Sequence, residues 1–129
     1  MKSNQLNNND NPSVSSPRDN PCLDTDSTVA ALKVIADDGH SYLLPYAQFL
    51  YAERDSNSAL EKEPDAPPEK MLIRFACADV VVLGSGLKTL ERAIQKFELK
   101  FVKSADRRLA ATLNTHIATL TVTLTKEIA

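Results

Sequence analysis

The sequence predicts an α+β domain, in which a small, mainly antiparallel sheet is packed by one amphipathic helix at about residues 86–98, behind a disordered N-terminal tail. Three observations predict this class. Short β-prone segments separated by turn residues recur along the chain, and one segment has a helical apolar period. The last segment alternates apolar residues with threonine. Strands that outnumber helices and do not alternate with them are typical of α+β domains.

Residues 1–27 form the expected tail. They contain no aromatic residue and are rich in Asn, Asp, Ser and Pro. A segment this polar cannot bury enough apolar surface to offset the entropy lost when its backbone is ordered. We therefore expect residues 1–27 to be disordered and residues 28–129 to form a single small domain.

The first ordered elements are expected to be the two strands of a hairpin. Residues 31–36 are β-prone, and residues 41–44 supply a return strand that ends at Pro45, because proline cannot donate to a ladder. The Asp-Asp-Gly-His sequence of residues 37–40 has the composition of a turn, since its glycine adopts a positive φ without steric cost. Residues 46–53 suit a strand or a short helix, and we favour a strand.

The middle of the chain combines a polar loop with two further strands. Residues 54–70 hold three prolines and five acidic residues, so we expect a mobile acidic, Pro-rich loop there. The apolar alternation over residues 71–83 predicts a pair of strands with a tight turn near Cys77, which we interpret as a structural residue.

One segment has the period of a helix. Four of its apolar residues recur at spacings of three, four and three, which is the core-facing stripe of an amphipathic helix. A Gly-Ser-Gly turn at residues 84–86 precedes it. Residues 99–103 fit an extension of this helix or a new strand, and residues 105–113 fit a second short helix. The apolar stripe consists of Leu87, Leu90, Ile94 and Phe97.

The last element should be a strand with two different faces. Over residues 118–125, apolar residues alternate strictly with threonine. One face is then buried, and the other is solvated or in contact with a partner. The apolar positions are Ala118, Leu120, Val122 and Leu124.

Composition restricts the compartment. The two cysteines suggest neither a disulfide framework nor a metal site, because no second Cys or His lies at ligand spacing from either. The N-terminus lacks the apolar region of a signal peptide, and no run reaches the ~18 apolar residues of a membrane helix. We therefore expect a cytoplasmic protein with no membrane association, no metal and no cofactor.

Charge is unevenly distributed, although the net charge is only −2. Residues 1–70 carry six basic and twelve acidic groups, whereas residues 71–129 carry nine and five. A basic helix face with basic residues after it could bind nucleic acid. The alternative is a solvated face that the acidic loop partly neutralises. The candidate nucleic-acid-binding residues are Lys88, Arg92, Lys96, Lys100 and Lys103.

No catalytic signature is present, so we expect a protein that is not an enzyme. The turn at residues 84–86 stands where phosphate-binding loops stand, but the dinucleotide fingerprint needs a third glycine and Thr89 occupies that position. A phosphate ligand at this turn remains an alternative. His40 lies in a predicted turn and His116 precedes the last strand, and neither belongs to a catalytic motif.

We expect a small non-catalytic interaction module, possibly one that associates with itself. Roughly 80 ordered residues without disulfides are close to the size at which one core is marginal, which favours a protein partner or a second copy. Nucleic acid is the alternative partner. The candidate interface residues belong to the aromatic segment and the last strand, and they are Tyr46, Phe49, Tyr51, Thr119, Thr121 and Thr123.

Overall fold

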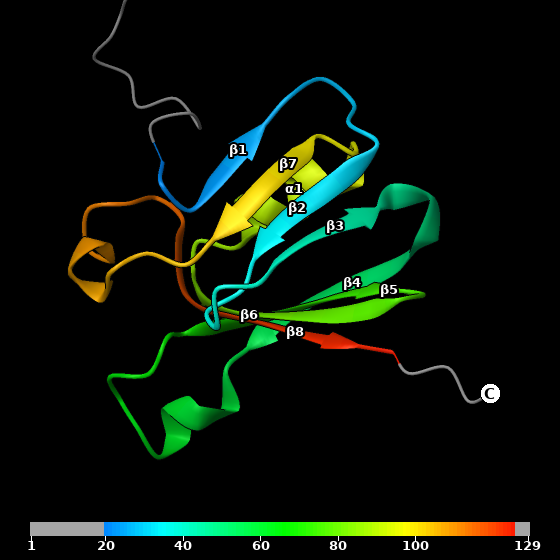
Figure 1. The fold of residues 1–129 in the computed structure, drawn as a ribbon. Coiled ribbons are helices and arrows are strands. Elements are labelled where there is room, and N and C mark those ends of the chain that lie inside the picture. The colour runs from blue at the N-terminus through cyan, green and yellow to red at the C-terminus, as the bar shows by residue number, and fades with distance from the viewer. Residues whose placement is uncertain (1–19, 126–129) are drawn as a thin grey trace, which may run out of the picture.

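The computed structural model describes residues 20–125, which form eight strands in two sheets and one α-helix (Figure 1). The α+β class, the antiparallel pairing and the single amphipathic helix are confirmed, and the strands divide between two sheets. Every pair is antiparallel except β2–β7. Sheet A has the order β1 (Leu23–Thr25), β7 (Leu99–Lys103), β2 (Ala31–Ile35) and β3 (Ser41–Pro45). Sheet B has the order β4 (Phe49–Ser56), β5 (Glu69–Phe75), β6 (Ala78–Ser85) and β8 (His116–Leu124).

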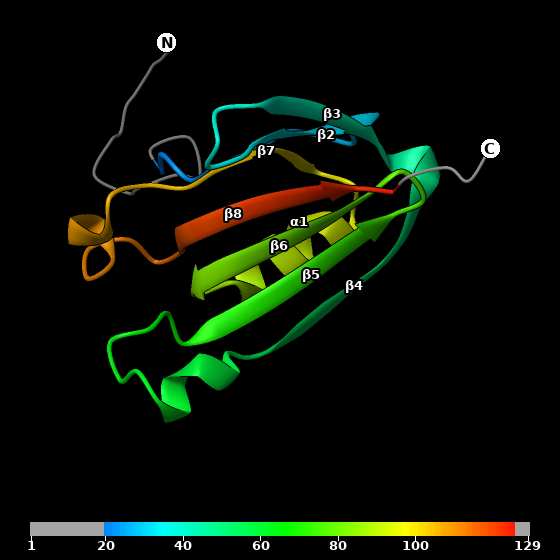
Figure 2. The same cartoon turned by 60° about the horizontal axis from the view of Figure 1, so that its bottom comes forward.

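The core lies between the two sheets and against α1 (Lys88–Gln95). The helix contacts β7 of sheet A and β4 of sheet B, and Figure 2 shows it behind β5 and β6. Leu90 and Ile94 of the predicted stripe are buried there with Val34 of sheet A and Val82 of sheet B. Each such side chain contributes about 1.5–3 kcal/mol when it is removed from water. One helix therefore closes the core that two short sheets leave open.

An aromatic cluster fills the end of the core where the chain passes from sheet A to sheet B. Residues 46–53 are not one strand, because the 3₁₀ turn Tyr46–Gln48 comes first and β4 begins at Phe49. The centroid of the Tyr46 ring lies 5.1 Å from that of the Phe97 ring and 6.1 Å from that of the Phe75 ring. Its hydroxyl donates to the Leu99 carbonyl at 2.6 Å, and burial raises the Tyr46 pKa.

Order begins earlier than the predicted end of the tail at residue 27. Residues 1–19 lie outside the described residues, but β1 falls within the predicted tail and pairs with β7. Cys22 is fully buried, and its Sγ accepts from the Ile117 amide at 3.3 Å. The tail prediction failed here because two apolar residues, Cys22 and Leu23, are enough to anchor a three-residue strand to an existing sheet edge.

The predicted loop and second helix are both shorter in the structure. The loop narrows to residues 57–68, since β4 and β5 extend into both ends of it. Asn57 closes the loop, because its side chain accepts from Ala59 and donates to the Pro67 carbonyl at 2.8 Å. Of the helix predicted over 105–113, only the 3₁₀ turn Arg107–Leu109 forms. The sequence allowed residues 99–103 to extend the helix or to start a new strand, and they form the strand β7.

The end of α1 places a bulky residue in an unfavourable backbone conformation. Phe97 has φ +56°, in the left-handed region that favours glycine. The amides of Phe97 and Glu98 bond back to Ile94 and Ala93, which is the usual closing pattern of a helix C-terminus. Phe97 is 40% exposed, but its ring packs against that of Tyr46, so aromatic packing holds the strained residue.

Two substitutions of Phe97 should separate strain from packing. Both Phe97→Gly and Phe97→Ala remove the ring, but only glycine relieves the left-handed strain of about 1–2 kcal/mol. We expect the glycine variant to be the more stable by about 1 kcal/mol in urea unfolding, which reverses the usual order of these residues. An alanine variant of equal or greater stability would contradict the strain.

Candidate interaction surfaces

The glycines of the predicted phosphate turn have a packing role. A Cβ on Gly84 would overlap the carbonyl oxygen of His116, and one on Gly86 would overlap that of Asn114. Gly86 also has φ +64°. The start of β8 therefore passes so close to this turn that only glycine fits at both positions.

An internal carboxylate occupies the amides of the same turn. Glu69 of β5 accepts from the amides of Gly86 at 3.3 Å and Leu87 at 3.1 Å, at the N-terminal end of α1. Arg54 lies 3.8 Å from the same carboxylate and donates to Glu91 at 3.0 Å. The donors that would hold a phosphate group thus already bind a side chain of this protein.

A cleft of about 730 Å³ opens where the loop 57–68 faces the start of β8. His116 lines it but is only 2% exposed, and its Nε2 lies 3.0 Å and 3.1 Å from the carbonyls of Ala105 and Asp106. The histidine thereby holds the segment before the turn Arg107–Leu109 in place. The other lining residues include Glu63, Asp65, Pro67, Ser85, Arg107 and Thr119.

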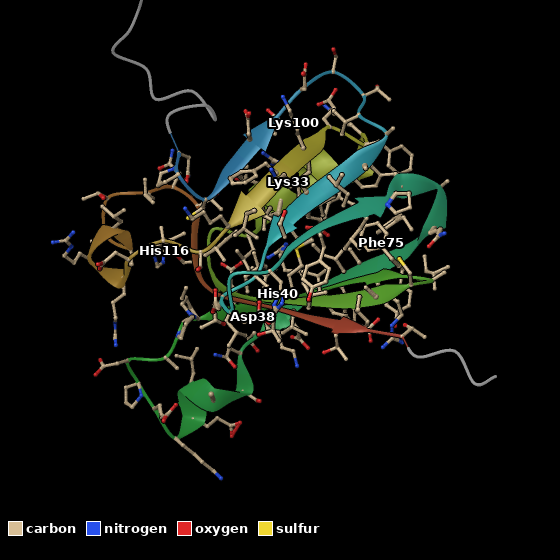
Figure 3. The ribbon with its side chains drawn as sticks, viewed as in Figure 1. Lys33, Asp38, His40, Phe75, Lys100 and His116 are labelled. Carbon is tan, nitrogen blue, oxygen red and sulfur yellow. The ribbon has the colours of Figure 1, made fainter. Side chains whose placement is uncertain are left out.

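The two histidines do not assemble a reactive group. His40 lies exposed in the β2–β3 turn, with its Nδ1 3.1 Å from Asp38 Oδ1. The Asp38 pKa is lowered mainly by the hydrogen bond from the His40 backbone amide and to a lesser degree by that from the His40 ring. His116 lies far from it at the start of β8 (Figure 3). Within residues 20–125, no group of three or more His, Cys, Asp and Glu side chains is placed to hold a metal ion.

The five predicted basic residues do not share one surface. Lys88, Arg92 and Lys96 are exposed on the side of α1 that faces away from the core. Lys100 and Lys103 belong to β7 and are exposed on the outer face of sheet A. Sequence proximity suggested a continuous stripe, but the chain turns between the helix and the strand, and the stripe divides in two.

The predicted interface residues divide between the core and one open face. Tyr46 and Phe49 belong to the aromatic cluster, and Tyr46 is only 8% exposed. Tyr51 lies on the outer face of sheet B and accepts from Arg74 at 3.1 Å. Arg74 makes a bidentate pair with Asp79, which raises the Arg74 pKa.

The three threonines lie on the same outer face, and β8 carries them along one edge of sheet B. Thr123 is the register partner of Asp79, Thr121 that of Val81, and Thr119 that of Leu83. Figure 2 presents this sheet with α1 behind it. Four of the six predicted interface residues, Tyr51 and the threonines, therefore share a surface.

Asp37, which was predicted only as a turn residue, forms hydrogen bonds with the edge of β8. The Asp37 amide donates to the Leu120 carbonyl at 2.9 Å, and the Leu120 amide donates to Asp37 Oδ2 at 3.1 Å. Both backbone groups of Leu120 thus point away from β6. By the alternation of an antiparallel ladder, those of Val122 and Leu124 point the same way. No partner for the outward groups of Val122 and Leu124 occurs among the described residues.

Comparison with protein-family models, with curated proteins and with solved structures finds no match to this chain. Within the described part of the chain, no helix has both the length and the apolar character needed to cross a membrane. The candidate surfaces therefore have to be judged on their own geometry.

The contribution of the Glu69 carboxylate at the start of α1 should be measurable in the free energy of unfolding. Glu69→Gln keeps the shape of the side chain but removes its charge from the helix N-terminus, so we expect a loss of about 1 kcal/mol in urea unfolding. Glu91→Gln is the matched control, because Glu91 pairs with the same Arg54 and does not accept from the turn. A loss in the control as large as in the Glu69 variant would contradict this role.

Proposed function

We propose that this protein is a non-catalytic interaction module that pairs with a second copy of itself through the free half of the β8 edge. The observation that carries the proposal is that the outward backbone groups of Val122 and Leu124 have no partner within residues 20–125. Leu124 is also 55% exposed, beside a core that its neighbours Leu120 and Val122 help to build. A second strand at this edge would cover the leucine and bond its backbone.

The other sheet edges carry features that oppose pairing. β1 is three residues long and irregular in register, and β3 ends at Pro45. β4 carries the charged sequence Glu53–Asp55 and a register shift near Tyr51. Short strands, charges, proline and irregularities are the features by which natural sheets avoid edge-to-edge association. β8 contains no Lys, Arg, Asp, Glu, Gly or Pro.

The direction of the backbone groups on β8 supports one particular register between the copies. Val122 and Leu124 direct their backbone groups outward, so Val122 of one copy suits Leu124 of the other, about a twofold axis at Thr123. A register centred on Val122 would instead place Leu120, which already bonds Asp37, opposite Leu124 of the second copy. In the register centred on Thr123, the two Thr123 side chains face each other, and cross-strand threonine pairs are favourable.

We also propose a reducing compartment such as the cytoplasm. Cys22 and Cys77 are both free thiols. Cys22 is buried and burial raises its pKa, so it has the character of an unreactive core residue. Unpaired cysteines in a small domain suit a compartment that keeps thiols reduced.

The oligomeric state provides the first test. We expect the parent protein to be dimeric in light scattering at high micromolar concentration, and Leu124→Lys to weaken the dimer by about tenfold or more. Leu43→Lys is the control, because Leu43 is 70% exposed on β3 of the other sheet. A monomeric parent, or equal weakening by both variants, would exclude pairing at β8.

Cross-linking tests the register. In a Cys77→Ala background, Thr123→Cys should form a disulfide between copies under mild oxidation, since the two Cβ atoms would lie about 4.5–5.5 Å apart. Thr121→Cys should cross-link far more slowly. Each residue 121 lies two positions from the twofold axis, so the two residues 121 do not face each other. Faster cross-linking through residue 121 would show that the register is wrong.

A further inference from the structure

The outer face of sheet A is open and mixes lysines with apolar side chains. Val34 and Val102 are register partners that point into the core, so their neighbours Lys33 and Phe101 point outward together. Lys103 pairs with Ile35 on the same face. Phe101 is half-buried and lies outside the buried cluster.

The register brings these side chains next to one another. Lys33 lies between Phe101 on β7 and Leu43 on β3, and Leu43 is 70% exposed. The β1–β7 pairing shifts register between Asp24 and Thr25, next to Lys100, so Lys100 is exposed beside Phe101 while Leu99 is buried. Figure 3 shows Lys33 and Lys100 on neighbouring strands of this sheet. Phe101 thus has Lys33 on β2 and Asp24 on β1 as its register partners, with Lys100 next to it in the chain, on a face that no other described layer covers.

We propose that the outer face of sheet A binds single-stranded nucleic acid. Lysines on an open sheet attract the phosphate backbone, and an aromatic ring between them offers a surface on which an unpaired base stacks. Leu43 and Ile35 add apolar contact for further bases. Within residues 20–125 this face consists of short strands, and no helix protrudes from it to enter the groove of a duplex, which favours single strands.

The charge distribution supports an anionic partner on this side. Lys33 and Lys103 form no ion pair with any described residue, and Lys100 lies 3.9 Å from Asp26 at the rim. The acidic loop 57–68 lies beyond sheet B, on the other side of the molecule (Figure 1). The three lysines outnumber Asp24, the register partner of Phe101, and Asp26 at the rim, so this face is basic in a chain whose net charge is −2.

Two triple variants with the same charge change make the test specific. Lys33→Gln, Lys100→Gln, Lys103→Gln removes the basic groups of sheet A, and Lys88→Gln, Arg92→Gln, Lys96→Gln removes those of α1. Fluorescence anisotropy measures the binding of labelled oligo-dT and oligo-U by both variants and by the parent protein. The oligonucleotides have about ten nucleotides, which is within the usual size range of such sites. A duplex of equal length is the competitor.

We expect parent affinity to fall about twentyfold when salt rises from about 50 to 200 mM, as three phosphate contacts on a single strand imply. The sheet A variant should lose most of this affinity and its salt dependence, and the α1 variant should stay within about threefold of the parent. Phe101→Leu should weaken binding about tenfold at either salt concentration, since it removes stacking but no charge.

Three results would overturn the proposal. They are no binding by the folded parent at about 50 mM salt, equal losses in the two triple variants, and a duplex that binds as tightly as the single strand. Circular dichroism of each variant establishes that it is folded. The β8 edge belongs to the other sheet, so dimerisation and nucleic-acid binding can fail independently of each other.

Discussion

The close passage of the start of β8 over the turn between β6 and α1 is the constraint on which the rest of the structure depends. Gly84 and Gly86 have no room for a side chain because the carbonyls of His116 and Asn114 lie against them. This approach seats β8 on β6 and completes sheet B. The same turn begins α1, whose first amides Glu69 takes up. One crossing point thus positions the last strand, the helix and the wall of the core between the sheets.

A single residue, Asp37, determines which part of the β8 edge is open, through its backbone amide and its carboxylate. Asp37 satisfies both outward groups of Leu120, and it does so from the turn of a hairpin in the other sheet. The contact ties the two sheets together and also covers half of an otherwise unprotected strand. The remaining half is short, uncharged and exposed, which suits a limited and specific pairing better than open-ended edge association.

The two sheets give the protein two different surfaces. The outer face of sheet B has charges that pair among themselves, as in the row formed by Tyr51, Arg74 and Asp79. The outer face of sheet A has lysines that pair little and apolar side chains that the core does not use. Paired charges on one side and an excess of lysines over Asp24 and Asp26 on the other favour different kinds of partner for the two faces.

Local patterns in the sequence determined the elements of this protein. The hairpin, the strand pair, the stripe of α1 and the alternation of β8 all follow from side chains a few positions apart, because helical and strand periods place them on one face. Only the tertiary structure decided which elements meet. It placed Phe101 outside the core, divided the basic residues between α1 and sheet A, and brought Asp37 to Leu120. Such contacts join residues far apart in the chain, and they depend on how two sheets pack around one helix, which no local period encodes.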